Sequence, residues 1–497
     1  MAPQLLLWNF AAGITVLYLF LCLQAGRQAE AMLAMMFQLS AFASAWLILA
    51  YQDRSGRMTI GNIGKLYACL CGAYLVFPSL LWFAKVHIAF PYGEYITDEI
   101  GIHLLWLHGA YLLAFFCSYA FMCGSAKRAF KIPKHRIPST MPGIVVCTLL
   151  LALLVAGRIW TGGSVGLERS TVVQEAHLEN VEAVRSGGIR LVLYQGLNRF
   201  NAYICCFSGL FVGMAFVRGR ASWTKRAGVL LGAMIIAVLL LAVSGGGRGP
   251  LILVLLAALV TVDYLAGPVK WKYLVAAALV GMVFAEYIAS VRASTDQVLS
   301  SGPGMERAQE YPARFFELTV MFSKEAAVVS AVQETGVQWG WTHLIRSALK
   351  VVPRQLLPAK ENWQSIAEYL RAMLLQSDAG EGTGVAGTAV GDGYITGGIL
   401  GVIIVGIIAG GILGLCQNRL AVSMGAQGGL WSIVPIAFLN ANLIFVLRSD
   451  LTSLFDVLVM GVIPLWVIVR LCCPPGNRGD RGVAPGLGRV TRTGKTQ

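Results

Sequence analysis

The sequence is poor in charged residues. Only 13% of its 497 residues are Asp, Glu, Lys or Arg, whereas an ordinary soluble domain has about 25%. The hydrophobic share is 57%, and long apolar runs recur from the first line of the sequence to the last. A run of about eighteen residues is long enough to cross about 30 Å of hydrocarbon. These features exclude a soluble protein and predict an all-α polytopic membrane protein.

Cysteine is absent from the long polar segments, since all eleven cysteines lie within or at the ends of apolar runs. We therefore expect no disulfide framework, and no Cys/His spacing indicates a structural zinc site. The net charge is +14, but no basic soluble face accompanies it, which excludes a nucleic-acid-binding protein. The N-terminus has neither a basic region nor a cleavage site before its first apolar run, which is predicted to be a retained helix.

Twelve apolar segments are predicted to span the membrane. They are roughly 4–24, 31–51, 66–90, 102–123, 141–158, 198–217, 228–243, 251–267, 273–291, 394–416, 429–447 and 454–471. Four short links between them are basic and nearly free of acidic residues, namely 52–65, 124–140, 218–226 and 267–272. By the positive-inside rule these links are cytoplasmic, which places both termini inside.

The predicted spans and loops divide the chain into six parts. These are spans one to five (1–158), an extracytoplasmic loop (159–197), spans six to nine (198–291), a large extracytoplasmic loop (292–393), spans ten to twelve (394–471) and a disordered basic cytoplasmic tail (472–497). A loop of about a hundred residues is far longer than the usual connection and is normally functional. Within it, Trp341–Val352 and Asn362–Leu375 have the apolar spacing of short amphipathic helices at the membrane interface.

A glycine-rich turn, Ser244-Gly245-Gly246-Gly247-Arg248-Gly249-Pro250, lies between two short apolar runs. It has the features of an anion cradle, because glycines expose backbone N–H groups, a helix N-terminus favours negative charge, and Arg248 adds a bidentate donor. It lacks the Gly-Lys-Ser/Thr ending of a nucleotide-binding P-loop. The alternative is a tight glycine hairpin in which Arg248 reaches lipid headgroups.

Arginine is common and lysine rare in the predicted extracytoplasmic segments. The guanidinium group matches phosphate and carboxylate oxygens bidentately and stays charged, so an arginine-lined chamber suits a pyrophosphate-bearing or acidic-sugar substrate. For any single arginine the alternative is a surface ion pair with a neighbouring glutamate. The arginines concerned are Arg158, Arg185, Arg190, Arg199, Arg292, Arg307, Arg314, Arg346, Arg354 and Arg371.

Two residues near these arginines are candidate general bases. Asp392 lies at the mouth of a glycine-rich helix, where a helix N-cap is the alternative role. His343 lies in the large loop, where the alternative is an ordinary interfacial histidine. Further carboxylates occur at helix ends or in this loop: Glu286, Glu306, Glu310, Glu317, Glu325, Glu361 and Glu368.

The glycines that follow Asp392 favour close helix packing. They form several pairs in which two small residues are separated by three others, a spacing that lets helix backbones approach each other in a membrane. The residues are Gly397, Gly398, Gly401, Gly406, Gly410, Gly411 and Gly414.

Three motifs, in the order SGGGRGP (244–250), VVPRQLLPAK (351–360) and GTAVGDGYITGGILG (387–401), together resemble the O-antigen polymerase family, the Wzy-type oligosaccharide repeat-unit polymerases. In that family a Gly/Ser-Arg-Gly turn precedes a helix. A stretch with Pro-Arg and a later Lys closes a large periplasmic loop, and an acidic residue followed by Tyr and glycines begins the next helix. The resemblance covers about 240–415. This chain has Asp392 where the family usually has Glu.

The resemblance implies a fold similar to the GT-C glycosyltransferases and an active site on the periplasmic side of the bacterial inner membrane. The enzyme would transfer a growing glycan from undecaprenyl pyrophosphate to a sugar hydroxyl of an incoming lipid-linked repeat unit, with no metal and no cofactor. A flippase and a chain-length co-polymerase are the implied partners, besides membrane lipids. Arg248 and Arg354 match the family pattern and would hold the pyrophosphate; Arg292, Arg199 and Arg314 are further candidates, and Arg185 and Arg371 fit an Arg-x10-Gly spacing of some members.

Three other classes of protein remain open from the sequence. A twelve-span transporter or lipid-linked oligosaccharide flippase fits the number of spans, but no half-repeat is visible and ionisable residues are nearly absent from the predicted span centres. An O-antigen ligase would use the same donor and similar arginines. A structural membrane scaffold would leave the arginine-rich loops unexplained.

Overall fold

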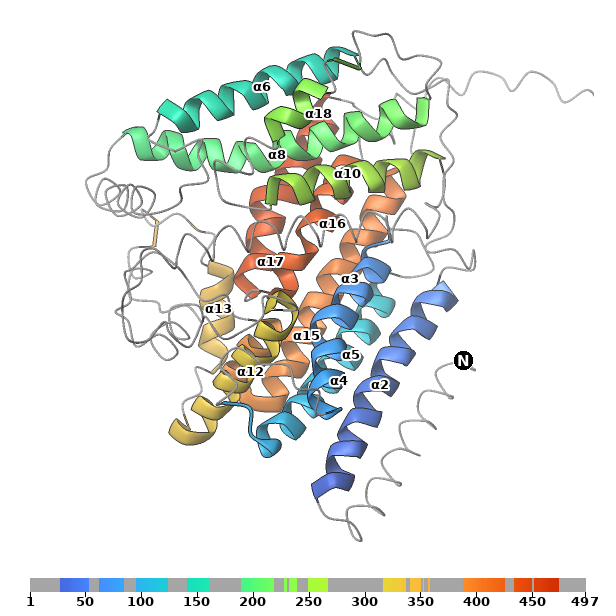
Figure 1. Cartoon of the computed structure of the whole chain (residues 1–497), viewed down its shortest axis with the longest axis vertical. Coiled ribbons are helices and arrows are strands. Elements are labelled where there is room, and N and C mark those ends of the chain that lie inside the picture. The colour runs from blue at the N-terminus through green and yellow to red at the C-terminus, as the bar shows by residue number, and fades with distance from the viewer. Residues whose placement is uncertain are drawn as a thin grey trace, which may run out of the picture.

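The computed structural model (Figure 1) describes residues 27–52, 62–84, 95–123, 141–160, 189–218, 228–229, 232–238, 249–266, 316–336, 340–349, 352, 356–357, 388–424, 433–448 and 451–472. Within these ranges the regular structure is entirely helical. The first half contains α2 (Arg27–Gln52), α3 (Ile63–Cys71), η1 (Gly72–Val76), α4 (Phe77–Phe83), α5 (Asp98–Cys123), α6 (Met141–Trp160), α8 (Ile189–Arg218) and α10 (Gly249–Ala266). The second half contains α12 (Phe316–Thr335), α13 (Trp341–Leu349), α15 (Ala389–Met424), α16 (Ile433–Arg448), α17 (Leu451–Val457), η7 (Leu458–Val462) and α18 (Ile463–Cys472).

Five helices in these ranges are long and apolar enough to cross a membrane. They are Gln28–Tyr51, Ile63–Phe83, Asp98–Cys123, Ala389–Arg419 and Leu451–Ile468. They coincide with five of the predicted spans. Shorter apolar helices, Pro142–Ala156, Asn201–Val217, Leu253–Ala266 and Ile433–Leu443, coincide with four more. The chain is therefore a helical polytopic membrane protein.

Three predicted spans have no counterpart among these nine helices. Segments 4–24 and 273–291 lie outside the described residues, and 228–243 is described only at 228–229 and 232–238, where it is helical. The total of twelve spans and the GT-C-like fold therefore stay predictions.

Two of the spans contain a π-helical turn, and a proline explains each turn. Pro78 follows η1, and Pro464 follows η7. A proline has no N–H group, and its ring clashes with the carbonyl four residues earlier. These carbonyls belong to Tyr74 and Met460, which lie inside the two π turns, where the wider helix gives them room.

The bundle is built around α5, which has α15 along one side and α2 along another (Figure 1). Gly406, Gly410 and Gly414 of α15 face the backbone of α5: a Cβ on Gly406 would lie 3.1 Å from the Tyr111 carbonyl oxygen, and one on Gly410 would meet the carbonyl oxygen of Phe115. The close helix packing predicted from the glycine spacing is thus confirmed. Aromatic rings continue the core, where Tyr67 stacks on Phe115 with ring centroids 4.2 Å apart.

A second group of helices, α6, α8 and α10, lies across the top of Figure 1 at a steep angle to α2, α5 and α15. Small residues again allow the approach, since a Cβ on Gly213 of α8 would lie 2.7 Å from the carbonyl oxygen of Ala258 in α10. Helix α16 contacts α8, α10, α3 and α15, and so connects the two groups.

The start of α15 is a separate short helix. The backbone breaks at Gly397 and Gly398, and Gly398 has φ 61° and ψ −143°, a conformation that is essentially confined to glycine. After the break the chain folds back, because a Cβ on Gly393 would lie 2.6 Å from the Cα atom of Val402. Asp392 and Tyr394 therefore belong to a short segment packed on the helix that follows it.

Helix α12 lies inside the bundle, although its sequence falls in the predicted large loop. It contacts α5, α15, η1 and α4. From Met321 to Val329 every residue is buried except Lys324, which is half-buried. Hydropathy does not reveal this helix, because Glu317, Lys324, Glu325 and Glu334 interrupt its apolar residues.

Candidate functional site

Contacts between distant segments show which helix ends lie together at each end of the bundle. At one end the N–H of Ile63 donates to Gln417 Oε1 at 3.0 Å, and the N–H of Gly64 donates to the Tyr119 hydroxyl at 3.1 Å. The predicted cytoplasmic links 52–65 and 124–140 adjoin this end. At the other end lie the first residues of α5, α15 and α17, together with α12 and α13. This second end adjoins the predicted extracytoplasmic loops.

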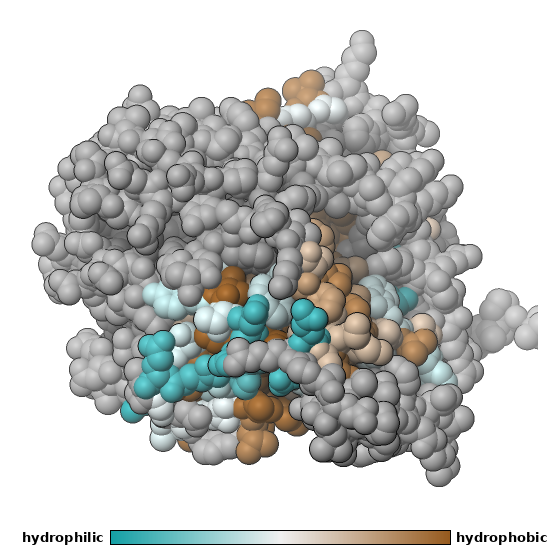
Figure 2. Space-filling model, turned by 60° about the horizontal axis from the view of Figure 1, so that its bottom comes forward, coloured by the Kyte–Doolittle hydropathy of each residue, from teal (hydrophilic) through white to brown (hydrophobic). Residues whose placement is uncertain are grey.

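The second end carries hydrophilic residues beside apolar ones, as Figure 2 shows from below. Exposed members include Asp98 and Glu99 of α5, Gln333 and Glu334 of α12, and Thr342 and Arg346 of α13. This end of the apolar bundle therefore has a polar surface with both signs of charge.

Asp392 is fully buried at this end and connects two helices. Its Oδ2 atom accepts a hydrogen bond from the N–H of Leu451, the first residue of α17, at 3.0 Å. Within its own helix the N-cap role belongs to Thr388, whose Oγ1 accepts from the N–H of Gly391 at 2.9 Å. Asp392 thus caps a helix, as the alternative role suggested, but the helix is α17 and not its own.

Tyr394 joins α15 to α5 and α12. Its ring meets that of His103 edge to face, with centroids 5.3 Å apart. Its hydroxyl lies near the Gln333 side chain of α12. The Nε2 atom of His103 is buried and has no hydrogen-bond partner among the residues that the structure describes. Three helices that are far apart in the sequence therefore converge on one tyrosine of the Asp-x-Tyr motif.

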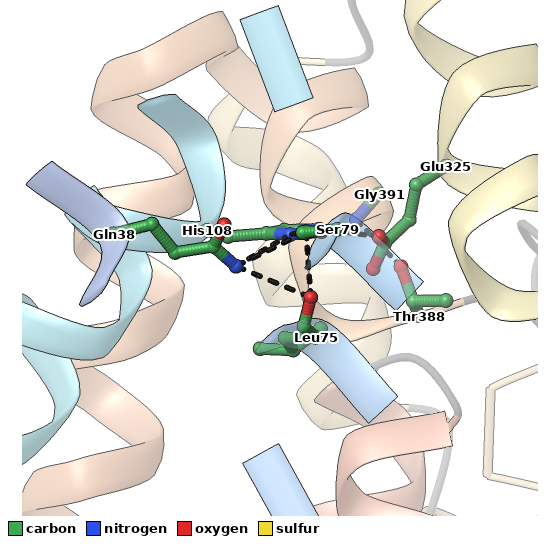
Figure 3. Close-up of polar contacts among 7 residues, drawn as sticks. All are labelled: Gln38, Leu75, Ser79, His108, Glu325, Thr388 and Gly391. Atoms are coloured by element: carbon green, nitrogen blue, oxygen red, sulfur yellow. Dashed lines mark hydrogen bonds and ion pairs between the residues drawn. The ribbon is translucent and has the colours of Figure 1, made fainter. Parts of the chain in front are cut away.

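The deepest polar contact of this region is a His–Glu pair (Figure 3). The Nε2 atom of His108 in α5 lies 2.6 Å from Oε2 of Glu325 in α12, and both side chains are almost inaccessible to solvent. His108 is the seventh residue of the predicted span 102–123, so it lies about 9 Å inside that span on a helix that rises about 1.5 Å per residue. That is about a third of the hydrocarbon thickness.

This pair corrects part of the sequence analysis. The sequence places Glu325 among the loop carboxylates. The structure instead places it beside His108 of α5, because α12 enters the bundle. Ionisable groups inside a span are costly unless they are paired, and leaving a buried hydrogen-bonding group without its partner costs about 1–3 kcal/mol, or more for a charged group.

The other side of the His108 ring is fixed by α2 and α4. Nε2 of Gln38 lies 3.3 Å from His108 Nδ1 and 3.2 Å from Ser79 Oγ, and it donates to the Leu75 carbonyl at 3.1 Å. Ser79 Oγ donates to the same carbonyl at 2.7 Å and lies 3.2 Å from Nδ1. A neutral ring that accepts at Nδ1 from Gln38 and donates from Nε2 to Glu325 satisfies this network.

The order Ser79, His108, Glu325 also resembles a nucleophilic triad. The geometry is against this interpretation, since the Ser79 hydroxyl is already bonded to the Leu75 carbonyl and all three side chains are buried. The network therefore fixes the position of the ring. It does not support a role for Ser79 as a nucleophile. Within the described part of the chain, two acceptor atoms near it, Gln38 Oε1 and Glu325 Oε1, have no hydrogen-bond partner.

Most of the predicted site residues cannot be placed. Arg185, Arg248, Arg292, Arg314, Arg354 and Arg371 lie outside the described residues. Arg199 is located only as a backbone position in α8, and His343 as one in α13. The structure therefore places Asp392 at the candidate site and leaves the arginine chamber a prediction. Among the described residues, no group of three or more His, Cys, Asp or Glu side chains is arranged to hold a metal ion.

The sequence analysis missed the His108–Glu325 pair and the contact of His103 with Tyr394. One signal was available: a histidine in the middle of an apolar span needs a buried polar partner. The partner itself was not identifiable, because Glu325 is 217 residues further along the chain.

The helices, their hydropathy and the polar end of the bundle define a polytopic helical membrane protein with a candidate site at one end. Residues 178–474 match the family model described as O-antigen polysaccharide polymerase Wzy. Because the match covers more than half of the chain, the chain belongs to this family, as the three motifs had indicated. Neither a curated protein nor a solved structure matches the chain.

Proposed function

We propose that this protein polymerises lipid-linked oligosaccharide repeat units at the periplasmic face of the bacterial inner membrane. The observation that carries the proposal is the match of 178–474 to the Wzy polymerase family. This range contains the arginine-bearing turn at Arg248, the Pro353-Arg354 stretch and the Asp392-x-Tyr394 segment. The substrate would be an undecaprenyl-pyrophosphate oligosaccharide, and the partners a flippase and a chain-length co-polymerase.

The proposed reaction is a glycosyl transfer. A sugar hydroxyl of the incoming unit attacks the anomeric carbon of the growing chain. The carbon–oxygen bond to the pyrophosphate breaks, undecaprenyl pyrophosphate leaves, and the hydroxyl proton passes to a base. Arg248 and Arg354, with Arg292, Arg199 and Arg314 as further candidates, would stabilise the charge that develops on the leaving pyrophosphate. This electrostatic role gives the reaction a route without a metal ion or cofactor.

The base is better sought at His343 than at Asp392. The Asp392 carboxylate is buried and accepts the N–H of Leu451, so it is held away from an acceptor sugar. His343 belongs to α13, which contacts α15 and α17 and has exposed neighbours at Thr342 and Arg346. We therefore assign Asp392 a positioning role and keep His343 as the candidate base.

The test is the length distribution of the surface polysaccharide on a gel. A strain without this protein is compared with strains that carry the wild type, Arg248→Ala, or Arg419→Ala at equal membrane abundance. We expect the null strain to carry single repeat units without a ladder, and Arg248→Ala to shorten or abolish the ladder. Arg419→Ala, an exposed position near the other end of the bundle, should give the wild-type ladder.

Other outcomes would point to the alternative functions. A null strain that attaches no sugar to the cell surface would indicate a ligase. Accumulation of repeat units on the cytoplasmic leaflet would indicate a flippase. A normal ladder with Arg248→Ala would indicate that the glycine-rich turn is a structural hairpin and does not bind the substrate.

A further inference from the structure

Polar side chains of three helices meet at the second end of the bundle. His103 of α5 and Tyr394 of α15 lie edge to face with ring centroids 5.3 Å apart, and the Tyr394 hydroxyl lies near the Gln333 side chain of α12. We call these three residues the tyrosine cluster. Gln333 is exposed, His103 is half-buried and Tyr394 is 7% exposed. The cluster therefore borders the surface of this end and is not part of the deep interior.

The tyrosine cluster has hydrogen-bonding capacity that the described part of the chain does not use. His103 Nε2 is buried and has no hydrogen-bond partner among the described residues, and a buried polar group without a partner costs free energy. By contrast, Asp392, two residues before Tyr394, has the N–H of Leu451 as its donor at 3.0 Å. The unpaired nitrogen beside Tyr394 is therefore a candidate for a contact with a ligand.

The packing of the three helices holds the cluster in place. Tyr394 belongs to the short segment that packs on the rest of α15, where a Cβ on Gly393 would lie 2.6 Å from the Cα atom of Val402. Helices α5 and α12, which carry the other two members, are joined by the contact of His108 with Glu325 at 2.6 Å. A site whose parts are already fixed loses less conformational entropy when a ligand binds.

The chemistry of the cluster suits an uncharged sugar better than a pyrophosphate. A neutral imidazole, a phenol and an amide each donate and accept hydrogen bonds, as a sugar hydroxyl does, and none has the permanent positive charge with which arginine binds phosphate. Two exposed carboxylates flank the cluster: Glu99 is one helical turn before His103, and Glu334 follows Gln333. Their negative charge disfavours an anion at this position.

We propose that His103, Gln333 and Tyr394 form a subsite that binds a sugar of the lipid-linked oligosaccharide, separate from the residues that bind its pyrophosphate. One sugar hydroxyl supplies the partner that His103 Nε2 lacks, and the Tyr394 hydroxyl and the Gln333 amide bind neighbouring hydroxyls. The inference rests on the proposed function, since it takes the sugar from that substrate.

The experiment measures binding of two probes to the purified full-length protein in lipid nanodiscs. The first probe is the repeat-unit oligosaccharide released by mild acid from the lipid-linked units of the producing strain, so that it carries neither lipid nor pyrophosphate. The second is undecaprenyl pyrophosphate, which carries no sugar. Saturation-transfer NMR gives the dissociation constant of the oligosaccharide, and the thermal unfolding midpoint is recorded for every variant. We expect the wild type to bind both probes.

The decisive variants remove polar atoms and keep an aromatic ring. Tyr394→Phe loses the hydroxyl and His103→Phe loses the two ring nitrogens. Each should bind the oligosaccharide about fivefold more weakly, the effect of one lost hydrogen bond between uncharged groups, and should bind undecaprenyl pyrophosphate within about twofold of the wild-type value. Gln333→Ala, at an exposed position where substitution does not disturb packing, should show the same selective loss. Tyr51→Phe makes the tyrosine change at an exposed position of the other end and should bind both probes like the wild type.

The outcomes separate this inference from the proposed function. Unchanged oligosaccharide binding in the three cluster variants would overturn the subsite, as would an equal loss of both probes, because the effect would then not be specific for the sugar. A wild type that binds undecaprenyl pyrophosphate but not the oligosaccharide would also overturn the subsite and leave the proposed function intact. If the wild type binds the oligosaccharide selectively through the cluster while the null strain keeps a normal ladder, the subsite stands and the proposed function fails.

Discussion

Asp392 shows how one buried carboxylate joins two distant segments of the chain. It lies in the short helix that begins α15, and its Oδ2 atom accepts the first N–H of α17, 59 residues later. A negative charge at a helix N-terminus is favourable, and a donor left unpaired after its removal costs about 1–3 kcal/mol. The sequence predicts Asp392 as a candidate base, but its contact with the N-terminus of α17 explains the residue without a catalytic role.

Substitution of Asp392 separates the two roles. Asparagine keeps an oxygen for Leu451 N–H but is not a base, while alanine removes both functions. If Asp392 positions α17, Asp392→Asn should lower the polymerisation rate by less than about tenfold, and Asp392→Ala should destabilise the protein by about 1–3 kcal/mol. Loss of about 10²–10⁴ in rate with Asp392→Asn, at unchanged thermal stability, would instead identify the general base.

At the scale of elements, small residues decide how closely the helices approach. Gly406, Gly410 and Gly414 are four residues apart and face Tyr111, Phe115 and Tyr119 of α5, which have the same spacing. The two stripes let the backbones of α5 and α15 come into contact, and dispersion contacts replace the hydrophobic effect that is missing between helices in lipid. The spacing in the sequence was sufficient to predict this packing, though not its partner.

Gly410→Ala tests this interface. Its added Cβ meets the carbonyl oxygen of Phe115, a backbone atom that cannot rotate away, so the helices must separate. We expect a loss of about 1–3 kcal/mol in stability, measured as the fraction that remains monodisperse after heating in detergent. The neighbouring Gly411→Ala is the control, since its Cβ meets side-chain atoms and no backbone atom, namely Ser118 Oγ at 3.0 Å and Met122 Cγ at 3.8 Å. Equal losses in both variants would contradict the close contact at Gly410.

At the scale of the whole molecule, the contacts divide the bundle into two ends that agree with the charge pattern of the sequence. The residues around Ile63, Tyr119 and Gln417 adjoin the basic links, and those around Tyr394 and Leu451 adjoin the arginine-rich loops. The interior between them is mostly apolar, with buried polar contacts between Tyr67 and Tyr111 and around His108. The proposed chemistry belongs to the second end.

This orientation predicts which positions a membrane-impermeant maleimide reaches in intact spheroplasts. Glu334→Cys, exposed at the second end, should be labelled, and Tyr51→Cys, exposed beside the predicted link 52–65, should react only after permeabilisation. The wild type, whose cysteines lie in apolar segments, measures the background. Labelling of Tyr51→Cys in intact spheroplasts, with Glu334→Cys silent, would reverse the orientation.

The sequence by itself determined what depends on local composition. Runs of apolar residues predicted nine of the helices that the structure describes, proline and glycine explain the π turns and the break at Gly398, and the helical spacing at Trp341–Val352 predicted α13. Three short motifs were sufficient to indicate the family that 178–474 matches. All of these signals lie within one segment of the chain, so no knowledge of the fold was needed.

Only the tertiary structure decided the placement of α12 and the roles of its polar residues. The charged residues of α12 lower its hydropathy, so the sequence predicts a loop there. In the bundle, however, Glu325 is buried against His108, which belongs to a helix more than two hundred residues away in the sequence. The same holds for Asp392, whose partner is the N-terminus of another helix. The burial of a charge depends on a partner that packing brings within hydrogen-bonding distance, and local sequence does not encode that distance.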